Sequence, residues 1–177
     1  FSVMFSGNIG SAQAVDVIID AAVLLQEYTD IHFIVLGDGS RRDWMLQEVI
    51  THDLSNFHLP GRFPIETMPG FMQKASVMLV TLASYEPFSS TVPSKVQAYM
   101  ATGRPILASL NGEGARLVVE AEAGLTVPAE DPRALAAAVL KLYKMPIIER
   151  ERMGDNGRNY YKENFNHDVL MVELVNT

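Results

Sequence analysis

One lysine that follows a segment rich in hydroxyl groups carries the strongest chemical signal in the sequence. Lys95 stands in the first turn of an expected helix, which the chain enters through Pro93 and Ser94. A cation is disfavoured at a helix amino terminus unless an anion also lies there, because the free N–H groups of that turn carry partial positive charge. The segment therefore predicts a site for a diphosphate, with a lysine that points into solvent as the alternative. Its other candidate ligands are Ser89, Ser90, Thr91 and Ser94.

Two glycine-containing turns follow expected strands. The first includes Gly7, Asn8 and Gln13, and its glycines would let the backbone approach a phosphate at the start of the next helix. The second, Gly37-Asp38-Gly39, offers the Asp38 carboxylate to a ribose hydroxyl. A purely structural role in a tight turn is the alternative for both. Glu113, at the start of a later helix, is a further candidate ligand, although the helix dipole alone would favour an acidic residue there.

The composition excludes several classes of protein. The 177 residues include 14 Lys and Arg against 21 Asp and Glu, a net charge of −7, which argues against nucleic-acid binding through phosphate neutralisation. The absence of cysteine excludes disulfides, thiol catalysis and iron–sulfur clusters. The four histidines lack the spacing of metal ligands, so we expect no metal site. Residues 56–112 nevertheless carry four basic and two acidic residues, a local positive excess that an anion site requires.

Short apolar runs alternate with segments of helical periodicity, a pattern typical of βαβ units on a parallel sheet. We expect an α/β fold, a Rossmann-like three-layer sandwich with a parallel sheet of about six strands. The glycine turns and the Lys95 segment follow strands, and open α/β sheets bind ligands at the carboxyl ends of their strands. The expected strands are 2–6, 32–36, 57–59, 76–82, 105–108 and 125–127, and the expected helices are 12–28, 41–52, 65–73, 94–102, 114–121 and 132–144.

Residues 1–177 are long enough for one domain with its own core. From residue 145 onward the composition shifts to a stretch rich in Glu and Arg, which predicts an exposed helix and a tail over 145–177 that needs a partner surface. Because residue 1 is Phe rather than Met and an expected strand already begins at Ser2, we expect the chain to begin inside a longer protein.

In chain order these segments resemble the carboxyl-terminal, nucleotide-sugar-binding half of GT-B glycosyltransferases of family 4, the group 1 transferases. The strand that ends in Gly37-Asp38-Gly39 is similar to the family's V-G-D-G signature, and Gly61 with Arg62 resembles its F-x-G strand end near the nucleobase. Residues 100–106, 124–128 and 153–158 resemble its later motifs. The variants G-N-I-G-x-A-Q, V-P-S-K-x-Q-x-Y-M-A-x-G-[KR]-P-I and N-G-E-G are similar to a branch of bacterial polysaccharide and lipopolysaccharide transferases.

The resemblance implies a nucleoside-diphosphate sugar as donor, with UDP expected from the bacterial branch, and no metal or other cofactor. Ser90 and Ala98 stand where the family has its two glutamates, and Glu86 lies four residues too early. The phosphate charge is then expected on Lys95, with Arg62 and Arg104 as helpers, and Lys95 and Glu86 are the candidate catalytic residues. The implied substrate-binding residues are Gly7, Asn8, Gln13, Gly37, Asp38, Gly39, Gly61, Arg62, Ser89, Ser90, Thr91, Ser94, Lys95 and Glu113.

The resemblance also implies partners and a location. A retaining transferase of this kind moves a hexose or related sugar to a glycan or lipid-linked acceptor, and its amino-terminal domain supplies the acceptor site. We expect a cytoplasmic protein, in contact with the inner face of the cell membrane only through that other half. This chain alone would bind the donor without completing transfer. Two alternatives stay open: half of a nucleotide-sugar 2-epimerase, and a non-catalytic domain that binds a nucleotide sugar or a protein.

Overall fold

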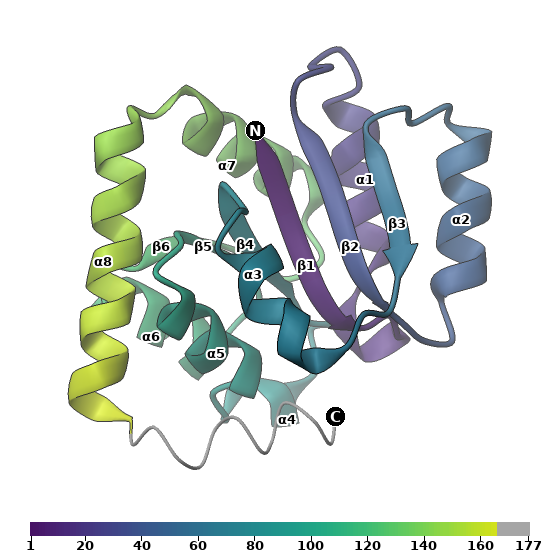
Figure 1. The fold of residues 1–177 in the computed structure, drawn as a ribbon. Helices are drawn as coiled ribbons and strands as arrows, with labels where there is room; N and C mark the ends of the chain where they lie inside the picture. The colour runs from purple at the N-terminus through teal and green to yellow at the C-terminus, as the bar shows by residue number, and fades with distance from the viewer. Residues whose placement is uncertain (166–177) are drawn as a thin grey trace.

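Six parallel strands form the centre of the computed structural model, which describes residues 1–165 (Figure 1). Their order in the sheet is β3-β2-β1-β4-β5-β6, and every neighbouring pair is parallel. The predicted α/β class and the six predicted strands are confirmed. The strands are β1 (Ser2–Asn8), β2 (His32–Asp38), β3 (Phe57–Gly61), β4 (Val77–Thr81), β5 (Ile106–Ser109) and β6 (Gly124–Val127).

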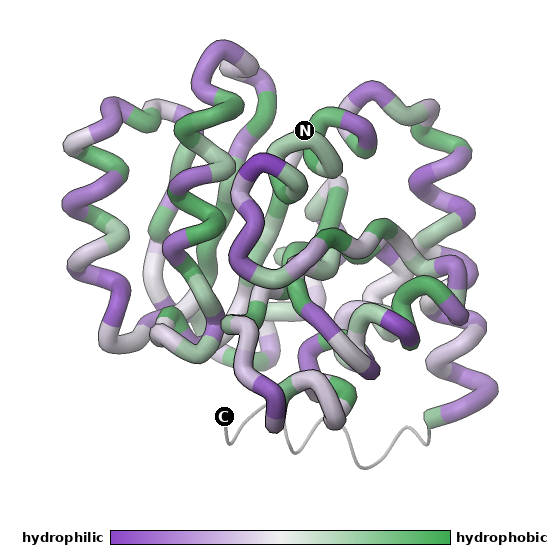
Figure 2. Tube along the Cα trace, turned by 180° about the vertical axis from the view of Figure 1, so that it is seen from behind, coloured by the Kyte–Doolittle hydropathy of each residue, from purple (hydrophilic) through white to green (hydrophobic). Residues whose placement is uncertain are grey.

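Helices cover both faces of the sheet because successive residues of a strand point to opposite sides. Phe5 packs in a core with helices α1, α2 and α7, whereas Met4 packs in a second core with α5, α6 and α8. Seen from behind, the covering helices alternate between hydrophobic and hydrophilic stretches, as helices with one buried side do (Figure 2). The helices are α1 (Asp16–Leu24), α2 (Arg42–Thr51), α3 (Met68–Met72), α4 (Glu86–Ser89), α5 (Ser94–Thr102), α6 (Glu113–Glu120), α7 (Pro132–Lys144) and α8 (Ile147–Asn164).

The first two strands are longer than predicted. Gly7 and Gly37 are residues of β1 and β2 that pair with each other, and the ladder continues to Asn8 and Asp38. Both glycines have positive φ angles, +136° and +137°, and a Cβ at position 37 would lie 1.9 Å from the Gly7 carbonyl oxygen. The two glycines therefore permit close pairing at the strand ends, where we had predicted the turns themselves to begin.

The first helix was predicted to span 12–28, and its predicted start is wrong. Residues Ser11–Gln13 form a 3₁₀ turn, after which Ala14 takes a left-handed conformation with φ +47° and donates its N–H to the Ser11 carbonyl. That conformation interrupts the helix, and α1 begins only at Asp16. The amino end of α1 thus lies several residues beyond the glycine turn that was expected to lead directly into it.

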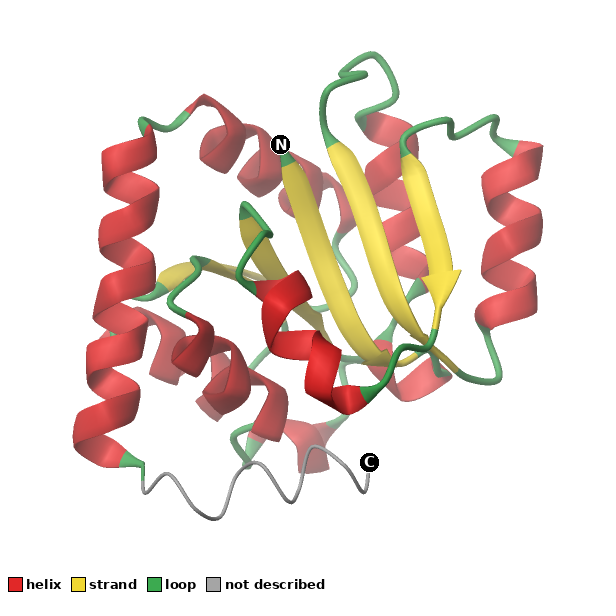
Figure 3. Ribbon diagram, viewed as in Figure 1, coloured by secondary structure: helices red, strands yellow, loops and turns green. Residues whose placement is uncertain are grey.

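Two further segments differ from expectation. The hydroxyl-rich loop before Lys95 contains the short helix α4, which lies at the edge toward which the strand arrows point (Figure 3). Helix α8 packs on α5 of the same domain, with Gly154 against the backbone of Gly103. Packing of the tail on another domain stays a prediction, and residues 166–177 of that tail lie outside the described part of the chain.

Candidate functional site

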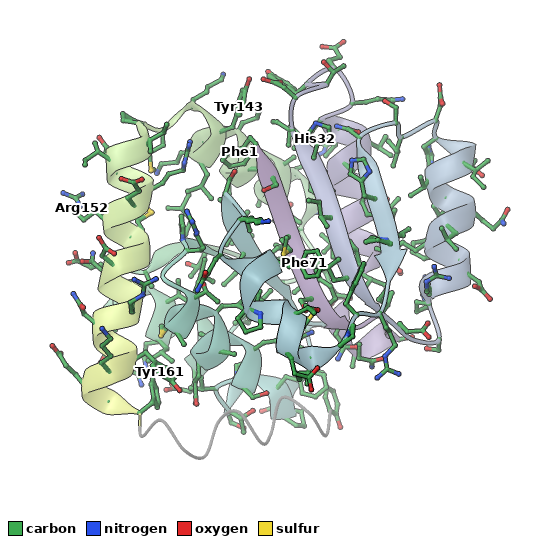
Figure 4. The ribbon with its side chains drawn as sticks, viewed as in Figure 1. Phe1, His32, Phe71, Tyr143, Arg152 and Tyr161 are labelled. Atoms are coloured by element: carbon green, nitrogen blue, oxygen red, sulfur yellow. The ribbon has the colours of Figure 1, made fainter. Side chains whose placement is uncertain are left out.

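A cavity of about 630 Å³ opens between α3 and α5 at the carboxyl ends of β1 and β4. We call it the Lys95 cavity. Its walls are mostly apolar and include Tyr161, which lies near the lower end of α8 in Figure 4. Large apolar pockets with a few polar groups are the usual form of small-molecule sites. The predicted site residues that line it are Gly7, Asn8, Gln13, Thr91, Ser94 and Lys95.

The cavity exists because β1 separates from β4. The two strands pair only at Val3 with Val77 and at Met4 with Met78, whereas β1 and β2 pair as far as Asn8. In the strand order the chain runs outward in opposite directions from β1 and β4, so this is the topological switch point of the sheet. Open α/β sheets bind ligands in the crevice at such a point.

Lys95 projects from the first turn of α5 into this crevice. Its Nζ lies 4.2 Å from the ring centre of Phe5, and a Cβ on Gly7 would lie only 2.5 Å from its Cε, so glycine at position 7 makes room for the lysine. Burial lowers the pKa of Lys95 to about 8. Within residues 1–165 no carboxylate lies within ion-pair distance of its ammonium group. The cation is therefore available to an anion that enters the cavity.

The amides of Asn8 and Gln13 form a polar edge of the same cavity. Asn8 Nδ2 donates to Gln13 Oε1 over 3.3 Å, and a Cβ on Gly10 would lie 2.9 Å from both side chains. Thr81 on β4 donates its hydroxyl to the Gln13 carbonyl, which ties this turn to the far wall of the crevice. Both amides can donate to phosphate oxygens without adding charge.

A second cavity, of about 340 Å³, adjoins the first, and we call it the Glu86 cavity. Leu82 and Phe88 line both cavities, so the two share a wall. The Glu86 carboxylate, the Ser89 hydroxyl and the Asn111 amide are among its polar groups. Such a mixture of donors and acceptors suits a ligand with many hydroxyl groups. Its other lining residues are Ala83, Ser84, Tyr85 and Leu110.

Other predicted site residues line neither cavity. Ser90 donates its hydroxyl to the Pro87 carbonyl, and one Asp38 carboxylate oxygen accepts the N–H of Gly39 over 2.8 Å. Glu113 pairs with Arg116 one turn further along α6, which holds the pKa of that carboxyl below its usual value. Gly37, Gly39, Gly61 and Arg62 also lie outside both linings.

Sequence reasoning missed several residues that build the site. Tyr99 is fully buried beside the cavity, and Phe5 lies under the Lys95 ammonium. Met68 and Met72 were interpreted as core filling, and they do pack against the second core, but they also line the Lys95 cavity. Their i, i+4 spacing predicts a shared helix face, which is compatible with a pocket wall as well as with a core.

Two histidines meet at the other end of the sheet. His32, at the start of β2, and His58 of β3 stack with ring centres 5.3 Å apart. Burial and the neighbouring imidazole lower the pKa of His58. Over residues 1–165, no group of three or more His, Asp or Glu residues is arranged to hold a metal ion. None of the helices in that range combines the length and the hydropathy that a membrane span requires.

Comparison with known sequences gives a family for this architecture. A family model described as "Glycosyl transferases group 1" matches residues 1–145. An uncharacterised glycosyltransferase of Methanocaldococcus jannaschii is 27% identical over 160 residues, which cover 90% of this chain and 43% of that protein. The chain therefore spans less than half the length of this curated relative.

Solved structures share the fold. HepE of Anabaena in complex with UDP-glucose superposes with a TM-score of 0.80 at 17% identity, over 99% of this chain and 48% of that one. The C-terminal domain of LpcC, a group 1 family protein of Francisella tularensis, gives a TM-score of 0.78 at 17% identity, over 95% of this chain and 87% of that one. The chain belongs to the group 1 glycosyl transferases and has the fold of the carboxyl-terminal domain of their GT-B architecture.

Proposed function

We propose that this chain binds a nucleoside-diphosphate sugar as the donor half of a retaining glycosyltransferase. The observation that carries the proposal is the Lys95 ammonium group, which enters a cavity at the switch point of the sheet without a carboxylate partner in residues 1–165. No side chain caps α5, so the N–H groups of Ser94 and Lys95 are available to the same anion, whereas the Val96 N–H donates to the Pro93 carbonyl. Membership in the glycosyl transferase family supports this assignment.

The two adjoining cavities suggest how the donor lies. The larger and mostly apolar Lys95 cavity takes the nucleoside, with its diphosphate on Lys95, Ser94 and the amides of Asn8 and Gln13. The smaller Glu86 cavity takes the sugar, whose hydroxyls bond to Glu86 and Asn111. Leu82 and Phe88 line both cavities, so in this arrangement the bond that joins sugar to diphosphate lies beside them.

In the transfer, the bond between the anomeric carbon and the diphosphate oxygen breaks, the anomeric carbon bonds to the oxygen of an acceptor hydroxyl, and the proton of that hydroxyl passes to the departing diphosphate. Negative charge grows on the departing diphosphate as the bond breaks. Preorganised donors aimed at that charge lower the barrier, and Lys95 with the free N–H groups of α5 fills this role. The acceptor is bound by an amino-terminal domain of the whole protein.

The proposal also includes a nucleotide, an acceptor and a location. UDP as the nucleotide is supported by HepE, which was solved with UDP-glucose, and by TarM of Staphylococcus aureus, solved with UDP. A glycan or lipid-linked acceptor, a place in bacterial polysaccharide or lipopolysaccharide synthesis, and a cytoplasmic location at the membrane face rest on the sequence resemblance alone.

A thermal-shift experiment tests donor binding directly. The chain is heated with millimolar UDP, GDP, TDP or no nucleotide. A ligand at about 100 times its Kd stabilises a protein by about 2.7 kcal/mol, which raises the Tm of a domain of this size by roughly 5–10 °C. We expect a shift with UDP that exceeds those with GDP and TDP. No shift with any nucleotide would refute donor binding by this chain.

A non-catalytic nucleotide-sugar-binding domain is the second candidate. Ala98 lines the Lys95 cavity at a position where the family resemblance implies a glutamate, and Ser90 lies outside both cavities. This candidate would be favoured if the chain binds UDP and UDP-glucose but the whole protein shows no turnover of UDP-glucose or UDP-N-acetylglucosamine. Turnover here means either hydrolysis of the nucleotide sugar or transfer of its sugar to an acceptor.

A further inference from the structure

Tyr99 makes an unusual pair of hydrogen bonds with the strand that borders the Lys95 cavity. Its hydroxyl accepts the backbone N–H of Ser6 over 3.0 Å and donates to the Ser6 carbonyl over 3.0 Å. The side chain is fully buried, so no water competes for either bond. One phenol thus satisfies both backbone groups of one residue of β1.

These are the groups that β4 would otherwise satisfy. Along β1, alternate residues direct their backbone groups toward β4: the Ser2 carbonyl accepts the Ser76 N–H, and Met4 is paired with Met78. Ser6 is the next residue of this series, but the ladder between β1 and β4 has already ended. Buried backbone groups need partners, and the Tyr99 hydroxyl takes the place of the missing strand.

The phenol therefore allows β1 and β4 to part within the protein interior. Ser6 and Gly7 on one side of the gap, and Val80 and Thr81 on the other, line the Lys95 cavity. Lys95 and Tyr99 are four residues apart on α5, so they share one face of the helix. Lys95 reaches Phe5, a residue of the core on the far side of the sheet, although α5 itself packs in the near core.

We propose that Tyr99 is a positioning residue: its hydroxyl keeps β1 and β4 apart, and the gap so formed fixes the Lys95 ammonium where the diphosphate of the donor binds. The inference rests on the proposed function for its ligand. The structural half of the inference is that Tyr99 determines how deeply the Lys95 ammonium group is buried. This half can be tested without any nucleotide, through the pKa of Lys95.

The test compares Tyr99→Phe with Tyr143→Phe. Both changes remove one tyrosine hydroxyl that makes a hydrogen bond, but Tyr143 bonds to Asp30 beside Phe1, at the opposite end of the sheet from Tyr161 (Figure 4). Circular dichroism establishes that each variant folds. The pKa of Lys95 is then measured by NMR titration of the lysine side chains, with Lys95→Ala for assignment, and UDP affinity is measured by calorimetry.

We expect the lysine pKa to rise from about 8 toward its unperturbed value of about 10.5 in Tyr99→Phe, because β1 and β4 close and expel the ammonium group into water. UDP affinity should fall at least fivefold in Tyr99→Phe and stay within twofold in Tyr143→Phe. A variant with 4-aminophenylalanine at position 99 keeps the donor to the Ser6 carbonyl, should give intermediate values, and carries the test if Tyr99→Phe does not fold.

A folded Tyr99→Phe protein with unchanged lysine pKa and unchanged UDP affinity would overturn the inference, since Tyr99 would then stabilise the fold without setting the site. A shifted lysine pKa in a protein that binds no nucleotide in its wild-type form would instead refute the proposed function while supporting the structural half of the inference.

Discussion

The Lys95 ammonium group lies 4.2 Å from the ring centre of Phe5, across the gap that opens between β1 and β4. An aromatic face attracts a cation but gives it no counter-charge. Among residues 1–165 that ring is the partner that faces the ammonium, and the resulting burial lowers the pKa of Lys95 to about 8. A buried cation of this kind binds an anion more strongly than an exposed lysine would, because less water must be displaced from it.

The first prediction concerns removal of this charge. Lys95→Ala should weaken UDP binding at least tenfold, about 1.4 kcal/mol, because the diphosphate loses its cation in a cavity of low polarity. Lys141→Ala, which removes an exposed lysine from α7 on the other side of the sheet, should leave the affinity within twofold. Calorimetry with UDP measures both. Equal affinities in the two variants would remove Lys95 from the site.

The second prediction is a pH dependence of the same binding. Only the charged lysine attracts the diphosphate, and the bound anion raises the pKa of Lys95 above its value of about 8 in the free protein. UDP affinity should therefore be level below about pH 7, fall about twofold by pH 8, and then fall with rising pH, by up to about tenfold per pH unit, until the pKa in the complex is reached.

Lys95→Ala is the control for this pH dependence. Its weaker affinity should be level over the same range, because the titrating group is gone. A profile that falls equally in both proteins would show that another group titrates.

The central strands β4 and β5 could be predicted from the sequence because they are buried on both faces. All five residues of β4, Val77–Thr81, are buried, so the strand is visible as one continuous apolar run. The strand ends were less predictable. Gly7 and Gly37 suggested turns, yet each glycine extends its strand because the other lies beside it, and that contact joins residues 30 positions apart.

The site was predictable only in its local part. Lys95 in the first turn of a helix, with hydroxyls before it, is a local pattern, and the structure does place Lys95, Ser94 and Thr91 at one cavity. Tyr99 and Phe5 could not be assigned, because their roles depend on where β1 leaves β4. The hydrogen bonds between Tyr99 and Ser6 join residues 93 positions apart. Ala14 likewise gave no local sign of its left-handed conformation.

The third prediction tests the packing of α8 on α5. A Cβ at position 154 would lie 2.1 Å from the Gly103 carbonyl oxygen, so Gly154→Ala should push the helices apart and destabilise the domain by about 2 kcal/mol. For a domain of this size the Tm should fall by about 4–8 °C. Gly70→Ala in α3 is the matched control, since nothing lies within 4 Å of its added Cβ. The Tm of Gly70→Ala should stay unchanged or rise, because alanine stabilises a helix more than glycine does.

If Gly154→Ala instead leaves the Tm unchanged, α8 does not rest on α5 in solution. The interpretation of 145–177 as a segment that packs on another domain would then gain support.

The fourth prediction separates the two cavities. Glu86 lines the smaller cavity and is absent from the lining of the one that holds Lys95. If the sugar lies in the Glu86 cavity, Glu86→Gln should leave UDP affinity within twofold but weaken UDP-glucose binding at least fivefold, because a carboxylate accepts hydroxyl hydrogen bonds more strongly than an amide does.

Glu66→Gln, in the 3₁₀ turn before α3, is the control for loss of one negative charge. Calorimetry measures the affinities of the wild-type protein and of both variants for UDP and for UDP-glucose, and each variant is compared with the wild type for each ligand. Parallel loss of both affinities in Glu86→Gln would mean that Glu86 supports the fold of the α4 segment, and the sugar would have to be sought in the Lys95 cavity itself.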